Sequence, residues 1–232
     1  MRVLVLRHGQ SQSNADPRAA ALPEAEGDRL TEQGHAQAAA AARWLSDRAI
    51  DRLITSPMRR ARQTTAPIAA ATGLTPEIDE GIHELRESDE YLELPPEEQK
   101  LRRWSVWMSE HGDDPDWAPP GGESFNTVLG RVTAFKARLE ALGADETVLV
   151  VSHGIFTRFF LVHSLLEGRF RASDVHRLWH LRTVNCGLSA FDPGERRHPA
   201  DPELDGWTCS AWMSRPWDDE AEALLPRLRH TA

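Results

Sequence analysis

Residues 3–14, VLVLRHGQSQSN, place a short apolar run directly before an arginine, a histidine and a glycine. A continuous apolar run such as Val3 to Leu6 is typical of a strand that is buried on both faces of a mostly parallel sheet. Polar residues at the carboxyl end of such a strand lie at the sheet edge where α/β proteins bind ligands. The stretch therefore predicts an α/β fold with a candidate site around Arg7 and His8.

Two further predicted strands end in a related way. Residues 147–151, TVLVV, form the clearest buried strand and are followed by Ser-His-Gly at 152–154. Residues 51–55 form another strand, which ends at Ser56 and leads into Arg59 and Arg60. Because the carboxyl ends of parallel strands meet at one edge, we expect these side chains to line one crevice.

Helices are expected between the strands, from apolar spacing and capping residues such as Thr31. Their predicted ranges are 31–46, 58–71, 124–142 and 154–166. Residues 76–85 are expected to be extended, and 187–191 and 207–213 to be strands, the last at a sheet edge. The alternation predicts a single domain over 1–232, a three-layer α/β/α sandwich with a mostly parallel central sheet.

The segment at about 87–120 breaks this alternation because it is rich in charge, proline and tryptophan. We expect a helical or irregular insertion that lies like a lid over the candidate site. Its tryptophans could line a pocket for a ring-bearing ligand, but packing against the sheet is the simpler interpretation. They are Trp104, Trp107 and Trp117.

Composition limits the class of protein. A net charge of -9 argues against a non-specific nucleic-acid binder, although a pocket can still attract an anionic small molecule. The two cysteines, Cys186 and Cys209, have no metal-ligand or redox spacing, which favours a reducing cytoplasm. No segment has the length of a membrane span, so no membrane partner is expected. The oligomeric state is left open.

The three strand ends would bring two imidazoles and two guanidiniums together. A guanidinium fork matches phosphate oxygens, glycine lets backbone N–H groups approach closely, and an imidazole nitrogen can attack phosphorus. Each motif taken alone has a simpler interpretation. A histidine after a strand can be a core residue, Ser-His-Gly can be a strand-to-helix turn, and Arg59 with Arg60 can be a solvated helix face. Their conjunction favours phosphoryl chemistry.

The stretch RHGQSQSN is followed along the chain by LTEQGHAQA, SPMRRARQT, HELRE, GGES and VSHG. These six motifs, in this order and spanning residues 2–154, resemble the histidine phosphatase superfamily, the phosphoglycerate mutase-like proteins. The resemblance implies that His8 is the nucleophile and that Arg7 and Asn14 hold phosphate oxygens. It also selects Arg60, which precedes an alanine, rather than Arg59 as a phosphate ligand.

The same resemblance assigns the remaining site residues. His153 would complete the electropositive pocket, and Gly9 would shape the loop and offer its N–H group. Glu84 would donate a proton to the leaving group, although Glu87 lies close enough in sequence to be an alternative donor. Gln10 departs from the glutamate that is common after RHG. The scheme requires no metal and no cofactor.

We therefore predict a metal-independent phosphomonoester hydrolase that acts through phosphohistidine on a small phosphorylated metabolite. Two alternatives remain: a phosphoglycerate mutase, and a catalytically idle binding module on the same fold. The mutases carry Arg-His-Tyr-Gly after the acid glutamate, whereas Leu-Arg-Glu follows Glu84 here, which favours hydrolysis. The substrate itself is not indicated.

Overall fold

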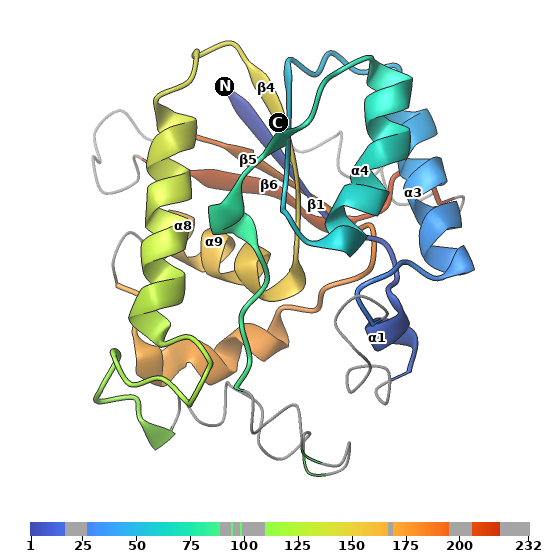
Figure 1. Ribbon diagram of the computed structural model, residues 1–232. Coiled ribbons are helices and arrows are strands. Elements are labelled where there is room, and N and C mark those ends of the chain that lie inside the picture. The colour runs from blue at the N-terminus through green and yellow to red at the C-terminus, as the bar shows by residue number, and fades with distance from the viewer. Residues whose placement is uncertain are drawn as a thin grey trace.

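The computed structural model describes residues 1–16, 27–88, 94, 98, 110–166, 169–194 and 206–218. Within these ranges six strands form one sheet, in the order β3-β2-β4-β1-β5-β6 (Figure 1). The first four strands in this order are mutually parallel, whereas β5 pairs antiparallel with β1 and β6 antiparallel with β5. The strands are β1 (Arg2–Arg7), β2 (Arg52–Thr55), β3 (Glu77–Ile78), β4 (Thr147–Ser152), β5 (Leu188–Asp192) and β6 (Thr208–Ser214).

Helices cover both faces of the sheet. In Figure 1, α3 and α4 lie together on one side of the strands and α8 lies on the other, where α9 packs against it. This is the predicted α/β/α sandwich with a mostly parallel sheet. The helices are α1 (Gln12–Ala15), α3 (Glu32–Leu45), α4 (Arg59–Thr72), α8 (Phe125–Glu140) and α9 (Gly154–Leu166), with 3-10 segments η2 (Glu80–Ile82) and η3 (Ala172–His180).

The apolar run of β1 supplies both halves of the core. Side chains alternate between the two faces of a strand. Val3 and Val5 accordingly join the cluster formed with α8 and α9, whereas Leu4 and Leu6 join the cluster formed with α3 and α4. All four are buried. Because β1 is buried on both faces, it fixes the position of His8, the residue that follows it.

Local signals account for the helix ends. Thr31 caps α3 by accepting a hydrogen bond from the Gly34 N–H group at 3.0 Å, and Ser124 caps α8 in the same way through the Thr127 N–H group. Helix α4 ends at Gly73, whose φ of 73° is the left-handed conformation that glycine adopts without strain.

The segment predicted to be extended over 76–85 is interrupted by a helical turn, with extended backbone at Asp79 before it and at His83 after it. Only Glu77–Ile78 pairs with β2, which is itself short. The Asp79 carboxylate then accepts a hydrogen bond from the Gly81 N–H group at 2.8 Å and turns the chain into η2. The residues that follow η2 form no regular element before Ser88.

Much of the predicted insertion at 87–120, including Trp104 and Trp107, lies outside the described residues. Trp117 is described: it stacks on His111 with ring centroids 3.7 Å apart and packs against the core cluster. Packing is therefore confirmed for this tryptophan. Both cysteines are free thiols. In the part of the chain that the structure describes, no helix has the length and apolar character of a membrane span.

Candidate active site

The register of the two central strands brings His8 and His153 together. Arg7 of β1 pairs with Ser152 of β4, and each histidine is the next residue of its chain. The His8 N–H group donates to the Ser152 carbonyl at 3.0 Å. The imidazole centroids are 5.1 Å apart with the rings tilted by 54°, and the two residues are 2% and 0% exposed. The predicted meeting of the two strand ends is thus present.

The hydrogen bonds of His8 define its tautomer. Nδ1 lies 2.7 Å from the Gly9 carbonyl oxygen, which can only accept, so Nδ1 carries the proton. Nε2 accepts a hydrogen bond from Arg60 Nε at 3.1 Å. Burial, followed by the charges of Arg60 and Arg7, lowers the pKa of His8 well below its usual value. The side chain is therefore a neutral imidazole with its lone pair on Nε2.

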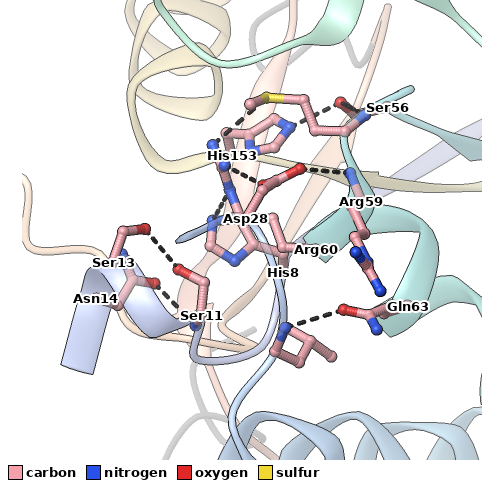
Figure 2. A network of polar contacts seen from close by, with 12 residues as sticks. His8, Ser11, Ser13, Asn14, Asp28, Ser56, Arg59, Arg60, Gln63 and His153 are labelled. Carbon is pink, nitrogen blue, oxygen red and sulfur yellow. Dashed lines mark hydrogen bonds and ion pairs between the residues drawn. The ribbon is translucent and has the colours of Figure 1, made fainter. Parts of the chain in front are cut away.

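Arg60 is held from the other side by Asp28 (Figure 2). One Asp28 carboxylate oxygen pairs with Arg60 Nη1, and the other accepts the Arg59 N–H group at the start of α4, at 2.7 Å. The Arg60 and Asp28 side chains are 12% and 9% exposed. The structure thus brings Arg60 to His8, whereas the Arg59 side chain is exposed. Sequence reasoning missed Asp28, because nothing local pairs it with a residue of α4.

His153 lies beside His8 and contacts a serine of the third strand end. Its Nε2 is 2.7 Å from Ser56 Oγ, and its Nδ1 is buried without a hydrogen-bond partner. Burial lowers the pKa of His153 well below its usual value, and the nearby charge of Arg60 acts in the same direction. Ser56 was predicted only as a strand end; its contact with His153 follows from the parallel pairing of β2 with β4.

Arg7 has an unused donor beside the histidines. Its Nε is buried with no hydrogen-bond partner, and Nη1 reaches the Thr183 carbonyl at 3.4 Å. Burial lowers the pKa of Arg7 to about 10, against the attraction of Glu84, so the guanidinium remains charged at neutral pH. A cation whose buried N–H group lacks a partner is suited to an anionic ligand.

Glu84 lies at the amino end of α9. Its carboxylate oxygens accept N–H groups from Leu85 at 3.0 Å and from Ile155 and Phe156 at 3.2 Å. These last two residues follow His153 closely, so the carboxylate and the imidazole share one helix start. Glu87, the alternative proton donor, is half-buried further along the same irregular segment.

The loop after His8 packs against the start of α3. A Cβ atom on Gly9 would lie 2.6 Å from the Gly34 carbonyl oxygen, and one on Gly34 would lie 2.1 Å from the Gln10 carbonyl oxygen. Both positions therefore require glycine. The Gly9 N–H group, predicted to face a phosphate, donates to Thr64 Oγ1 at 2.9 Å. The side-chain oxygen of Gln10 accepts a hydrogen bond from Thr31 Oγ1 at 2.8 Å and so ties the loop to the residue that caps α3.

Asn14 lies in α1, at the edge of the group in Figure 2. Its Oδ1 accepts from Asn185 Nδ2 at 2.8 Å and from the Ser11 N–H group at 3.5 Å, and its side chain is exposed. Asn185 Nδ2 also lies 3.3 Å from the His8 carbonyl oxygen. Asn185 was not predicted, and it ties the Asn14 amide to the backbone of His8.

Comparisons with known proteins find similarity over most of the chain. The family model described as histidine phosphatase superfamily (branch 1) matches residues 3–224. An uncharacterized protein of Mycobacterium tuberculosis is 32% identical over 190 residues, which cover 82% of this chain and 87% of the relative. A Yersinia pestis protein named probable phosphoglycerate mutase GpmB is 30% identical over 232 residues, covering 98% of this chain and 97% of the relative.

Solved structures also resemble this chain over most of its length. A mycobacterial glucosyl-3-phosphoglycerate phosphatase in complex with VO3 has a TM-score of 0.69 and 26% identity, covering 92% of this chain and 99% of that one. A structure titled mycobacterial hydrolase 1 has a TM-score of 0.66 and 26% identity, covering 91% and 98%. With a family model that spans nearly the whole sequence, the chain belongs to the histidine phosphatase superfamily.

Proposed function

We propose that the protein is a phosphomonoester hydrolase that acts through a phosphohistidine at His8. One observation carries the proposal: His8 is a buried, neutral imidazole whose unprotonated Nε2 accepts a hydrogen bond from the guanidinium of Arg60. A neutral imidazole is the nucleophilic form, and fixed guanidiniums stabilise the charge on a moving phosphoryl group. Arg7, with its unused buried Nε, is the second such guanidinium.

In the first step, Nε2 of His8 attacks the phosphorus atom of the monoester as the bond from phosphorus to the ester oxygen breaks. Arg7, Arg60 and His153 supply donors to the phosphoryl oxygens, and Asn14 holds one of them from the edge of the site. The departing alkoxide takes a proton from the Glu84 carboxyl group, because an unprotonated alkoxide is a poor leaving group.

In the second step, a water molecule attacks the phosphorus atom of the phosphohistidine. The Glu84 carboxylate takes a proton from that water as the bond between phosphorus and Nε2 breaks. Inorganic phosphate leaves, and His8 returns to its neutral tautomer. This sequence balances protons without a metal ion, and Glu84 alternates between acid and base.

The substrate we propose is a small phosphorylated metabolite, and phosphorylated hydroxy acids head the panel to test. A solved relative is named as a glucosyl-3-phosphoglycerate phosphatase, which supports this class. A second candidate is phosphoglycerate mutase activity, supported by the name of the Yersinia pestis relative. Interconversion of 2- and 3-phosphoglycerate without net phosphate release would identify the mutase.

The test is phosphate release from p-nitrophenyl phosphate in the presence of EDTA. We expect turnover by the wild-type protein and none by His8→Ala, while His176→Ala, at an exposed position of η3, keeps the wild-type rate. Activity that survives His8→Ala would overturn the assignment of the nucleophile. An inactive wild-type protein that still binds phosphate or vanadate would indicate the idle binding module instead.

A further inference from the structure

The irregular segment that carries Glu84 is held on both sides by two side chains, Glu123 just before α8 and Arg131 within it. Nη1 of Arg131 donates to the Gly81 carbonyl at 2.7 Å and to the His83 carbonyl at 3.2 Å. On the other side of Glu84, the Arg86 N–H group donates to Glu123 Oε2 at 2.9 Å. The segment is thus fixed both before and after the proposed proton donor.

The two residues that hold it are themselves a buried ion pair. Arg131 Nε donates to Glu123 Oε1 at 2.8 Å and Nη2 donates to Glu123 Oε2 at 2.9 Å, a two-point contact that fixes both side chains. The side chains are 14% and 6% exposed. Because the two charges neutralise each other, the pair fixes the position of the neighbouring backbone and adds little to the electrostatic field of the site.

The backbone around this pair is tightly packed. The Glu123 N–H group donates to the Arg86 carbonyl at 3.1 Å, so residues 86 and 123 are joined twice. A Cβ atom on Gly122 would lie 3.2 Å from the Ser88 nitrogen, so the neighbouring backbone also approaches closely. From the sheet, Ser152 Oγ donates to the Ile82 carbonyl at 2.9 Å. The segment therefore has little freedom to shift relative to β4.

We propose that Glu123 and Arg131 are positioning residues for the Glu84 carboxyl group. Neither needs to touch the substrate: they hold the backbone of Glu84 so that its side chain reaches the start of α9, next to His153. The inference rests on the proposed role of Glu84 as proton donor. Proton transfer demands placement within a fraction of an ångström, so loosening the backbone weakens it selectively.

The experiment compares kcat/KM for two esters, p-nitrophenyl phosphate and glycerol phosphate. The first has an activated leaving group that departs without a proton, whereas the second requires one. The ratio of the two values does not depend on how much of the sample is folded, so simple destabilisation does not change it. We expect Glu123→Gln and Arg131→Lys to raise this ratio in favour of p-nitrophenyl phosphate by about tenfold.

Arg138→Lys is the matched control. Arg138 lies two turns further along α8 and pairs with Glu77 and Asp79, upstream of the Glu84 segment. Its replacement removes an arginine from the same helix, and we expect the ratio to stay within about twofold of wild type. Glu84→Gln should raise the ratio most, and adding Arg131→Lys to it should raise it no further.

The outcomes separate the two proposals. If Glu84→Gln raises the ratio while Glu123→Gln and Arg131→Lys leave it unchanged, the positioning role is wrong and the proton donor stands. If Glu84→Gln itself leaves the ratio unchanged while His8→Ala is inactive, the assignment of the proton donor is wrong and the positioning role falls with it.

Discussion

Arg60 Nε donates to His8 Nε2 across 3.1 Å, so the guanidinium and the nitrogen that would attack phosphorus are partners in the ligand-free protein. An entering phosphoryl group has oxygens that accept this N–H group. Its arrival would release the lone pair of Nε2 toward phosphorus and keep the guanidinium satisfied. The resting contact thus holds both groups in a buried site until a substrate replaces it.

This contact predicts the point of phosphorylation. Because Nδ1 is protonated and bonded to the Gly9 carbonyl, a trapped phosphoenzyme should carry its phosphorus on Nε2 of His8. Nitrogen-15 NMR of the ligand-free protein at neutral pH should show that Nδ1 of His8 is protonated and Nε2 is not. A phosphoenzyme linked through Nδ1 would contradict the assigned tautomer.

Asp28→Asn should impair both activity and stability. The change leaves the largely buried charge of Arg60 without a counter-charge. It should therefore lower the free energy of unfolding by about 3–5 kcal/mol. Misplacement of the guanidinium should lower kcat/KM by about tenfold to a hundredfold. The control is Asp174→Asn on η3, where a pair with the exposed Arg177 should contribute at most about 1 kcal/mol. Urea unfolding and initial rates measure both effects; equal losses in the two variants would contradict the prediction.

Gly34→Ala should displace the loop that follows His8. The new methyl group would lie 2.1 Å from the Gln10 carbonyl oxygen, so α3 and the loop must move apart. We expect a lower Tm and a loss of activity of about tenfold or more. Gly130→Ala in α8 meets nothing within 4 Å and should raise stability by up to about 1 kcal/mol with activity unchanged. Unchanged activity in Gly34→Ala would contradict the close packing.

The buried histidines predict a fall in stability at acidic pH. In the folded protein the pKa values of His8 and His153 are well below the usual value, whereas the unfolded chain binds protons at about pH 6.5. Below that pH the unfolded state therefore takes up protons that the folded state does not, and stability is lost.

Each such histidine adds up to about 1.4 kcal/mol per pH unit to that slope until its folded pKa is reached. Urea unfolding between neutral pH and pH 5 measures it. His153→Gln should make the slope shallower, and His180→Gln, at an exposed position, should keep it. An unchanged slope in His153→Gln would mean that this imidazole already binds a proton in the folded protein.

Local signals predict most of the regular structure. The helix expected over 31–46 is observed at Glu32–Leu45, and the strand expected over 147–151 at Thr147–Ser152. Caps and apolar runs lie within the segments that they define, so one sequence suffices to locate them. The segment predicted to be extended over 76–85 is interrupted at η2, because a side-chain contact of Asp79 turns the chain there.

Residue patterns alone predict the site where it continues a strand, whereas Arg60 and Glu84 are assigned only through the family resemblance. His8 and His153 follow buried strands directly, so their meeting can be expected from the order of strand and helix. The partners that orient the site come from distant parts of the chain, as with Asp28 on Arg60 and Asn185 on Asn14. Such pairings depend on how loops pack, and no spacing in the sequence encodes them.

The two histidines follow the two central strands, β1 and β4, and the amide hydrogen of His8 is bonded to Ser152 across them. Local opening begins at chain ends and loops, and central strands exchange their amide hydrogens only when the whole domain unfolds. The distance between the His8 and His153 rings should therefore be kept for as long as the domain is folded. A destabilising substitution that leaves the loops around the site in place would therefore reduce the number of folded molecules without changing the turnover of those that remain folded.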